Sequence, residues 1–378
     1  MSVIKGVFSL RYVVAVWAGL LLLTLCLRPV ASEPGWVVVN LHPDPWWESQ
    51  ASAVAGRYQG GHAYDPGITT SVQPVVWHDT ASFTSLGSAS LGEIRGMSGL
   101  DKVGVYGGRA ALWQGADSTY VNLWPADDSV ACATWGGWQV GRIFNDFTRA
   151  SMWNGSAASR VNLHPADAVS SVALAIDGSG QAGLFRTDRV SGAHAALWQG
   201  SAQSVVDLHP AGAYSSQAQA IANGRQGGYV QFERDGTYYP AVWSGTAESF
   251  VNFSAPGAPT DAGLIYGMDG NVQVGGARFL DGSGGATIWF GTPESAFNLA
   301  SLLSSDYTRS EARAVDIDEF GTIRVVGRAY NENYYLPNGT YYPRYEAMMW
   351  VLVPEPSSLA ALVAGLAGLA GVRPRRRR

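Results

Sequence analysis

The stretch AHAALWQGSAQSVVDLHP, residues 193–210, decides the fold because its two halves recur along most of the chain. The first half is an apolar run that ends at Trp198, and the second is a polar–apolar run that ends in Leu-His-Pro. Related copies are RAALWQGADSTYVNLWP (109–125), RASMWNGSAASRVNLHP (149–165), PAVWSGTAESFVNFSAP (240–256) and ATIWFGTPESAFNLA (286–300). A unit copied this often indicates a repeat architecture.

Each half of the unit can be found seven times. The first type of run ends at Trp77, Trp113, Trp153, Trp198, Trp243, Trp289 and Trp350. The second type ends at Leu41, Leu86, Leu123, Leu163, Leu208, Phe253 and Leu299. Between them lie alternating segments around a Gly, Asn or Asp turn, as in SSVALAIDGSGQAGLFR (170–186), which is typical of a β-hairpin. The sequence therefore predicts four strands in each unit of about 45 residues.

Four-stranded units repeated seven times predict an all-β fold, a seven-bladed β-propeller over residues 33–352. The chain opens with a lone run of the second type (36–41) and closes with a lone run of the first type ending at Trp350. Pairing of these two would close the ring without a free strand edge. An open β-solenoid and two separate sandwiches are the alternatives.

Composition supports many short strands. The 378 residues include 46 Gly, 14 Trp and 17 Tyr, and only 15% are charged, which argues against a disordered chain. The two cysteines are Cys26 and Cys132, and loss of an N-terminal signal would leave Cys132 alone, without an intramolecular disulfide. In its apolar run, SVACATW, we expect Cys132 to be a small buried hydrophobe.

The N-terminus has the order of a secretory signal. Lys5 and Arg11 precede the apolar run 12–27, and the small residues before Ser32 suit a signal peptidase that cuts between Ser32 and Glu33. The sequence thus predicts a signal peptide over residues 1–32, with an uncleaved membrane anchor as the alternative.

The C-terminus combines three features in order. Val353-Pro-Glu-Pro is followed by SSLAALVAGLAGLAGV (357–372) and by a basic tail. A helix of those sixteen residues would span roughly 24 Å, a little short of a bilayer core of about 30 Å. Positive residues remain on the cytoplasmic side of a membrane. The basic residues expected there are Arg373, Arg375, Arg376, Arg377 and Arg378.

Residues 353–378 resemble the PEP-CTERM sorting signal of Gram-negative bacteria. The resemblance implies recognition and cleavage near Pro354, Glu355 and Pro356 by an exosortase-type enzyme. It also implies a chain anchored transiently in the inner membrane and then placed on the outer surface or outside the cell. A plain single-pass tail anchor is the alternative.

The repeat resembles the HAF repeat of exported bacterial proteins. Its closest copy is His194-Ala-Ala-Leu-Trp198, where Ala replaces the Phe of the motif, and most other units lack the His. The family has no settled activity to carry over to this chain.

Charge excludes one class of partner. Without the three bases of the N-terminal segment and the five tail arginines, 17 basic residues face 30 acidic ones, a net charge of about −13. Such a body would repel nucleic acid and anionic lipid surfaces.

Metal and cofactor sites are not expected. His42, His164 and His209 end equivalent runs, but zinc needs its donors at about 2.0–2.1 Å from one point, and the outer strands of neighbouring blades are too far apart. Calcium takes six to eight oxygens, whereas each hairpin turn offers one carboxylate or amide. These turn residues are Asp177, Asn223 and Asp269.

No motif marks a catalytic site. A glycosidase needs two carboxylates in one cleft, and nothing in the sequence pairs the acidic candidates. They are Asp127, Asp128, Asp316, Asp318 and Glu319. A secreted glycosidase or lyase on the propeller scaffold therefore stands as the alternative to a non-catalytic protein.

Clustered aromatic residues are the candidate binding residues. Adjacent aromatics in a strand point to opposite faces, so one ring of each pair should be exposed and able to stack on sugars, unless both pack between blades. The candidates are Trp46, Trp47, Trp135, Trp138, Tyr238, Tyr239, Tyr334, Tyr335, Tyr341 and Tyr342. An insertion at 331–345 should form a loop over one rim. We thus expect an exported, non-catalytic surface protein that binds extracellular polysaccharide.

Replacing Glu355 with Gln tests the sorting hypothesis. We expect the E355Q chain to remain uncleaved and membrane-bound, because the processing enzyme would no longer find the acidic residue between the two prolines. Cell fractionation with intact-mass analysis measures this. Glu332→Gln, in the insertion, is the matched control and should be processed normally. Normal processing of E355Q would refute the hypothesis.

Overall fold

A computed structural model describes residues 35–44, 46–64, 71–335 and 339–354. Trp36–Leu352 form one compact unit, and Met1–Gly35 with Val353–Arg378 are grouped separately. Pro354 is described and lies after the last strand. The other predicted processing and membrane features lie outside the described residues: Ser32, Glu33, Glu355, Pro356, the apolar run 357–372 and the five tail arginines. No helix within the described ranges has the length and apolarity needed to cross a bilayer.

The strands of the first four blades are β2 (Ser49–Ala55), β3 (Tyr58–Tyr64), β4 (Val72–His78), β5 (Phe83–Ser85); β6 (Gly92–Ser98), β7 (Asp101–Tyr106), β8 (Arg109–Gln114), β9 (Thr119–Asn122); β10 (Ser129–Trp135), β11 (Trp138–Asn145), β12 (Phe147–Trp153), β13 (Val161–Asn162); β14 (Ser170–Asp177), β15 (Gly180–Arg186), β16 (His194–Trp198) and β17 (Val206–Asp207). Those of the last three are β18 (Ser215–Ala222), β19 (Arg225–Gln231), β20 (Tyr238–Trp243), β21 (Val251–Asn252); β22 (Thr260–Asp269), β23 (Val272–Phe279), β24 (Gly284–Trp289), β25 (Phe297–Asn298); β26 (Tyr307–Ile317), β27 (Ile323–Asn331), β28 (Arg344–Leu352) and β1 (Trp36–Asn40). Short 3₁₀ turns are η1 (Ala157–Ser159), η2 (Ala202–Ser204), η3 (Ala247–Ser249), η4 (Pro293–Ser295) and η5 (Leu299–Leu302).

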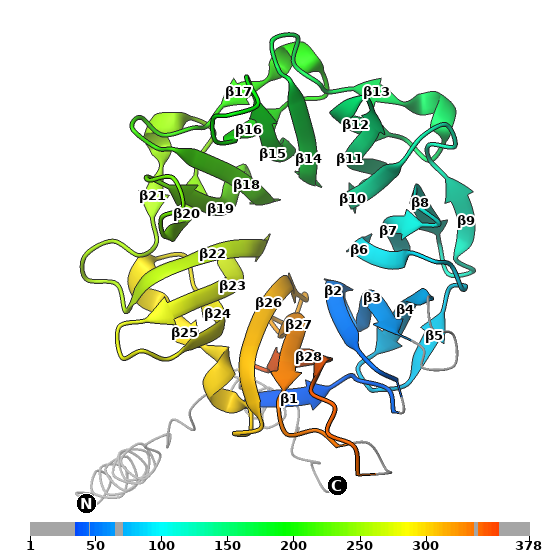
Figure 1. Cartoon of the computed structure of the whole chain (residues 1–378), viewed down its shortest axis with the longest axis vertical. Coiled ribbons are helices and arrows are strands. Elements are labelled where there is room, and N and C mark those ends of the chain that lie inside the picture. Colours follow the sequence, from blue (N-terminus) through cyan, green and yellow to red (C-terminus); the bar gives the residue numbers. More distant parts are fainter. Residues whose placement is uncertain (1–34, 45, 65–70, 336–338, 355–378) are drawn as a thin grey trace, which may run out of the picture. The chain divides into compact units, whose positions relative to one another are not determined.

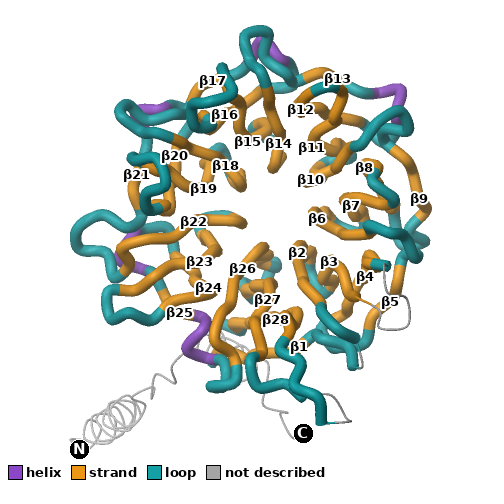
Figure 2. The backbone as a smooth tube through the Cα atoms, in the orientation of Figure 1, coloured by secondary structure: helices purple, strands orange, loops and turns teal. Residues whose placement is uncertain are grey.

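The strands of this unit form seven four-stranded antiparallel sheets, which we number as blades 1 to 7 in the order just given. Figures 1 and 2 show the blades arranged in a ring around a central channel, with β2, β6, β10, β14, β18, β22 and β26 innermost. The predicted all-β seven-bladed propeller is confirmed, and the solenoid and sandwich alternatives are wrong.

Both ends of the unit build blade 7. Strand β1 pairs with β28 in a register that runs from Trp36 opposite Leu352 to Asn40 opposite Met348. The blade order is β26-β27-β28-β1, so the N-terminal strand is its outer edge. The predicted closure of the ring by its first and last strands is therefore confirmed.

The seven repeat tryptophans are buried between neighbouring blades. Each lies at the end of a third strand or within two residues of it, and all are at most 1% exposed. Trp198 of blade 4 shares a core cluster with Val140, Met152 and Leu163 of blade 3. Trp77 of blade 1 packs in the same way against Met349 and other residues of blade 7. Burial of a large aromatic at every seam joins neighbouring sheets into one ring.

Each innermost strand carries a one-residue register shift, a β-bulge, at an equivalent position. Facing the bulge, the second strand always carries glycine, because a Cβ there would lie 1.8–2.0 Å from a carbonyl oxygen of the innermost strand. No real Cβ fits at that distance. The seven residues are Gly61, Gly104, Gly141, Gly183, Gly228, Gly275 and Gly327.

Two neighbouring glycines of β23 test this constraint. A Cβ on Gly275 would lie 1.9 Å from the Leu264 oxygen, whereas a Cβ on Gly276 would meet only the Gly285 oxygen, at 3.7 Å. We expect Gly275→Ala to reduce the free energy of unfolding by about 3 kcal/mol or more, because backbone must move. Gly276→Ala should change it by less than about 1 kcal/mol. Urea unfolding followed by tryptophan fluorescence gives both values, and equal losses would contradict the steric argument.

Candidate functional site

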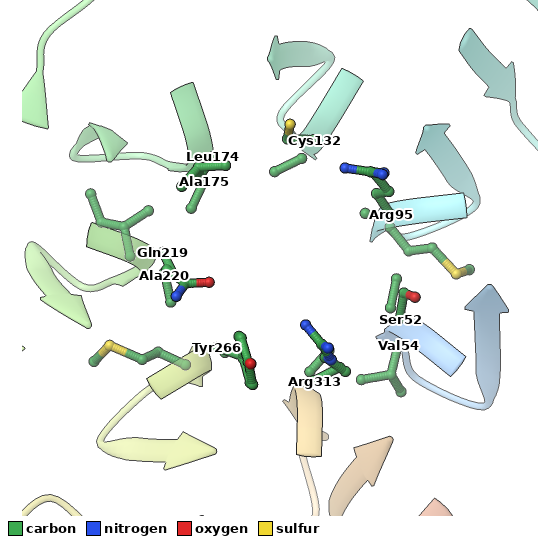
Figure 3. Close-up of a pocket in the computed structure, with 18 of the residues that line it drawn as sticks. Ser52, Val54, Arg95, Cys132, Leu174, Ala175, Gln219, Ala220, Tyr266 and Arg313 are labelled. Carbon is green, nitrogen blue, oxygen red and sulfur yellow. The ribbon is translucent and has the colours of Figure 1, made fainter. Parts of the chain in front are cut away.

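The seven bulges place seven side chains in the central channel (Figure 3). They are Ser52, Arg95, Cys132, Leu174, Gln219, Tyr266 and Arg313, one from each innermost strand, and we call them the channel ring. One section of the channel, of about 190 Å³, is lined by this ring and by the residues that follow it in each strand. A second section, of about 270 Å³, is lined by the ring together with Gln50 and Glu93.

The two sections differ in the side chains that lie beside the ring. In the first section the residues that follow the ring are Ala, Gly, Val, Met and Ile, apart from Thr134. Gln50 and Glu93 precede the ring by two residues and make the other section polar. This second section lies near the first residues of the innermost strands. We call this end of the propeller the polar rim. Because strands alternate in direction, the loops between second and third strands lie at this same rim.

Both arginines of the channel ring are paired with glutamates. Arg95 donates from Nε to Glu93 Oε2 at 3.0 Å, and Arg313 is paired with Glu311. Burial alone would raise the pKa of Glu93, but the adjacent His62 and Arg95 side chains lower it to about 2. Glu93 is therefore ionised at neutral pH. Sequence reasoning missed these residues, although each ring residue is recognisable between small or apolar neighbours, as in Ala312-Arg313-Ala314.

Cys132 differs from its prediction in location. It is half-buried at the bulge of β10 and faces the channel beside Arg95, rather than packing in the core. Burial raises the pKa of its thiol, an effect that the charges of Arg95 and Arg142 oppose. The thiol is therefore protonated at neutral pH and is a poor nucleophile.

The ten candidate aromatics fall into three groups. Trp135 and Trp138 flank the turn between β10 and β11, at the rim opposite the polar one. Tyr238 and Tyr239 lie at the start of β20, on the polar rim. The other six, in the segment before β2 and the insertion between β27 and β28, also belong to the polar rim. The structure thus brings together six of the ten.

Within this third group, two sets of rings are in contact, and one of them includes Tyr64. Trp47 lies nearly parallel to Tyr64, with ring centroids 6.0 Å apart, and 6.1 Å from Tyr342. The rings of Tyr335 and Tyr341 are 5.4 Å apart and are 58% and 50% exposed. We call these five residues the rim aromatic surface. The expectation of exposed rings in the insertion is met by Tyr335 and Tyr341.

Two other candidates of this group have structural roles. Trp46 meets Phe83 edge-on at 5.0 Å and packs against the core of blades 7 and 1. The guanidinium of Arg344 covers the ring of Tyr334 at 3.4 Å. Both rings are partly buried, and their contacts assign them to packing and to anchoring the insertion.

Arg344 anchors the insertion to the segment before β2. Its side chain is buried and donates to Glu346 Oε1 at 2.8 Å, to Asp44 Oδ1 at 3.0 Å and to the Trp46 carbonyl at 3.0 Å. Glu346 also accepts a hydrogen bond from the Tyr307 hydroxyl at 2.7 Å. This network holds the rim aromatic surface in place.

Of the four remaining candidates, Trp135 and Tyr238 are exposed, whereas Trp138 and Tyr239 are partly buried. Trp135 is 47% exposed and lies over Gly178, while Trp138 packs against the core between blades 3 and 4. Tyr238 is exposed and meets Tyr229 edge-on at 4.9 Å, and Tyr239 lies near Phe232.

The three Leu-His-Pro histidines join neighbouring blades. His42 Nδ1 is 2.7 Å from Ser49 Oγ, which accepts a hydrogen bond from the Ala347 amide across the seam between blades 7 and 1. Because the Trp46 carbonyl can only accept, Nε2–H of His42 donates to it at 2.9 Å, and in the neutral ring Nδ1 then accepts from the Ser49 hydroxyl. His164 and His209 make equivalent contacts with Ser171 and Ser216. Within the part of the chain that is described, no three His, Cys, Asp or Glu side chains are grouped to hold a metal.

The acidic candidates are also used in local structure. Asp177 accepts hydrogen bonds from Ser179 within its turn, and Asp269 accepts one from the Ile317 amide of the next blade. Asp316 accepts one from the Gly56 amide, also in the next blade. Asp318 is paired with Arg324, and Asp128 with Arg109.

Comparisons with known proteins show the fold and no more. No protein-family profile matches the chain. No curated protein sequence matches it either. Among solved structures, it is similar to an acylaminoacyl peptidase of Pyrococcus horikoshii, with 12% identity and a TM-score of 0.50 over 79% of this chain and 52% of that one. TolB from Acinetobacter baumannii has 11% identity and a TM-score of 0.45, with 64% of each chain covered. The chain thus spans between half and two thirds of their lengths.

Acidification tests the histidine links. Burial and the charge of Arg344 lower the pKa of His42 to about 4, against 6.5 in an unfolded chain. As the pH falls from 6.5 toward 4, the unfolded chain binds a proton that the folded chain does not, so stability is full above pH 6.5 and falls below it. His42 should contribute about 2 kcal/mol of the loss in stability between pH 7 and 5.

His42→Gln should therefore lose less stability than the wild type over the same pH range, as measured by urea unfolding at each pH. The exposed His78→Gln is the control and should keep the wild-type pH dependence. An H42Q profile as steep as that of the wild type would show that His42 does not titrate in this range.

Proposed function

We propose that the chain is an exported, non-catalytic protein of the bacterial envelope that binds exopolysaccharide through the rim aromatic surface. The observation that carries this proposal is the exposed Tyr335 and Tyr341 on an insertion that breaks the repeat. Exposed aromatic rings bind sugars through their apolar faces and offer hydroxyl groups at their edges.

The support beneath these rings favours binding. Arg344 ties the insertion to the Trp46 carbonyl, and its pairing with Glu346 is buried. A surface that is already ordered loses little entropy when a ligand binds. Tyr342 follows Tyr341 in the chain and contacts Trp47, which stacks on Tyr64, so a polysaccharide that crosses this rim would meet rings of both sets.

The channel chemistry favours binding over hydrolysis. A glycosidase needs one carboxyl group that carries a proton at the working pH. Glu93, which lines the channel, and Glu311, which is paired with Arg313, are each held by a guanidinium, and the pKa of Glu93 is lowered to about 2. Hydrolysis or elimination by a carbohydrate-active enzyme is therefore the second candidate.

The sorting part of the proposal rests on the sequence. The predicted signal peptide (1–32) would take the chain to a signal peptidase, and the Pro354–Glu355–Pro356 motif to an exosortase-type enzyme. Cleavage near that motif would separate the propeller from the apolar run and the basic tail. The released protein would then reach the outer surface or the extracellular matrix.

Removing the exposed rings tests the binding proposal. We expect the Tyr335→Ala/Tyr341→Ala double variant of the full-length chain to bind polysaccharide at least about tenfold more weakly, because each stacked ring contributes on the order of 1 kcal/mol. Affinity electrophoresis through gels containing bacterial exopolysaccharides measures the change. Trp135→Ala, at the opposite rim, removes an equally exposed ring and should migrate like the wild type.

Two results would overturn the proposal. One is unretarded migration of the wild type in every polysaccharide gel, and the other is equal retardation of the double variant. Release of reducing or unsaturated sugar ends by the wild type would instead establish the carbohydrate-active enzyme.

A further inference from the structure

Two guanidinium groups flank one hydroxyl in the polar section of the channel. Arg313, Ser52 and Arg95 come from β26, β2 and β6, the innermost strands of three consecutive blades. Figure 3 shows both arginine side chains directed into the channel on either side of Ser52. The bulge at each position supplies this orientation, so the three groups are held by rigid backbone.

Each group keeps hydrogen-bond donors for a ligand. A guanidinium has five N–H donors. Arg95 uses Nε and Nη2 toward Glu93, while Arg313 uses Nη2 toward Glu311, and its buried Nε has no partner among the described residues. The Gln50 amide donates to Ser52 Oγ at 2.9 Å, which leaves the Ser52 hydroxyl hydrogen to donate.

Positive charge is in excess at this place. Glu311 is shared by Arg313 and Arg328, whose Nη2 lies 3.3 Å from Glu311 Oε2. With the Arg95–Glu93 pair, three guanidiniums meet two carboxylates, a surplus of one positive charge. Residues 36–352 as a whole carry 17 basic and 28 acidic side chains. A local surplus in an acidic body directs an anion to the channel.

The size and rigidity of the polar section limit which anions can bind there. Its volume of about 270 Å³ is below the roughly 300–1,000 Å³ of pockets for drug-sized ligands, so it suits a single small molecule. Arg313 stacks on Tyr266 at 4.1 Å, which fixes the plane of its guanidinium. One surplus charge matches a monoanion, whereas a phosphate monoester carries about −1.5 to −2 at neutral pH and would meet the two glutamates.

We propose that the polar section of the central channel binds a small sugar carboxylate, a uronic acid, with its carboxylate between Arg95 and Arg313. Planar guanidiniums bind carboxylates through paired, charge-assisted hydrogen bonds. Gln219 of blade 5 and Tyr266 of blade 6 also line this section and supply an amide and a phenol for the sugar hydroxyls. This site is separate from the rim aromatic surface and does not depend on it.

The alkylation rate of Cys132, in the channel ring, measures whether a ligand occupies the channel. Because the raised pKa of Cys132 leaves little thiolate at neutral pH, the full-length chain is alkylated slowly with iodoacetamide at about pH 9, and peptide mass spectrometry follows modification at Cys132. Sodium D-glucuronate, up to about 20 mM, should slow this modification, whereas D-glucose should not. A second arm compares oligogalacturonate with free galacturonate. If the oligomer protects Cys132 at a lower concentration than the free sugar, the site binds a uronate at a chain end.

Charge-matched variants test the residues. Arg95→Gln/Glu93→Gln removes the guanidinium without changing net charge and should weaken glucuronate protection at least about tenfold. Arg278→Gln/Asp261→Asn, an exposed pair outside the channel, should leave protection unchanged. Should the first variant not fold, Ser52→Ala removes one donor and should weaken protection about threefold.

Three outcomes would overturn this assignment. They are equal protection by glucose, stronger protection by inorganic phosphate than by glucuronate, and unchanged protection in the R95Q/E93Q or S52A chain. These outcomes do not depend on the polysaccharide experiment. The Tyr335→Ala/Tyr341→Ala variant should still be fully protected by glucuronate, because its substitutions lie outside the channel.

Discussion

The close approach of the two inner strands in each blade is the constraint on which the structure depends. At every bulge, a carbonyl oxygen of the innermost strand occupies the place of a side chain on the second strand. Glycine is the sole residue without a Cβ, so it is required there in all seven blades. The same bulge turns one side chain into the channel. One steric requirement therefore sets both the backbone of the blade and the lining of the proposed site.

The residues that join neighbouring blades are different from the residues that line the channel. Trp198 and its equivalents bury a large ring against the preceding blade, and Ser171 with its equivalents accepts an amide hydrogen bond across the same seam. Neither interaction involves the ring residue of the innermost strand. The ring position can therefore be Ser, Leu, Tyr or Arg without disturbing the packing between blades. For this reason seven similar blades can surround a channel whose lining differs from blade to blade.

The blades were predictable from the sequence because their signals are local. Trp198 and its equivalents mark the third strands at regular spacing, and the two lone runs at the ends predicted the closure of blade 7. The channel was not predicted, because a bulge depends on how two strands pair, and a pattern such as Ala312-Arg313-Ala314 has the same alternation as an ordinary strand. Trp135 and Tyr335 seemed equivalent in sequence, yet the alternation of strand direction places them at opposite rims. Cys132 was misplaced for the same reason as the other ring residues.

Blade 7 also imposes an order of events. Strand β1 is the first part of the propeller to be synthesised, but its partner β28 is the last. Until β28 forms, β1 has no partner within its sheet, and Trp77 lacks Met349 and the other blade 7 residues against which it packs. Contacts between such distant parts of a chain form slowly. Completion of the ring is therefore a late kinetic step, and a chain interrupted before residue 344 would expose unpaired strand edges.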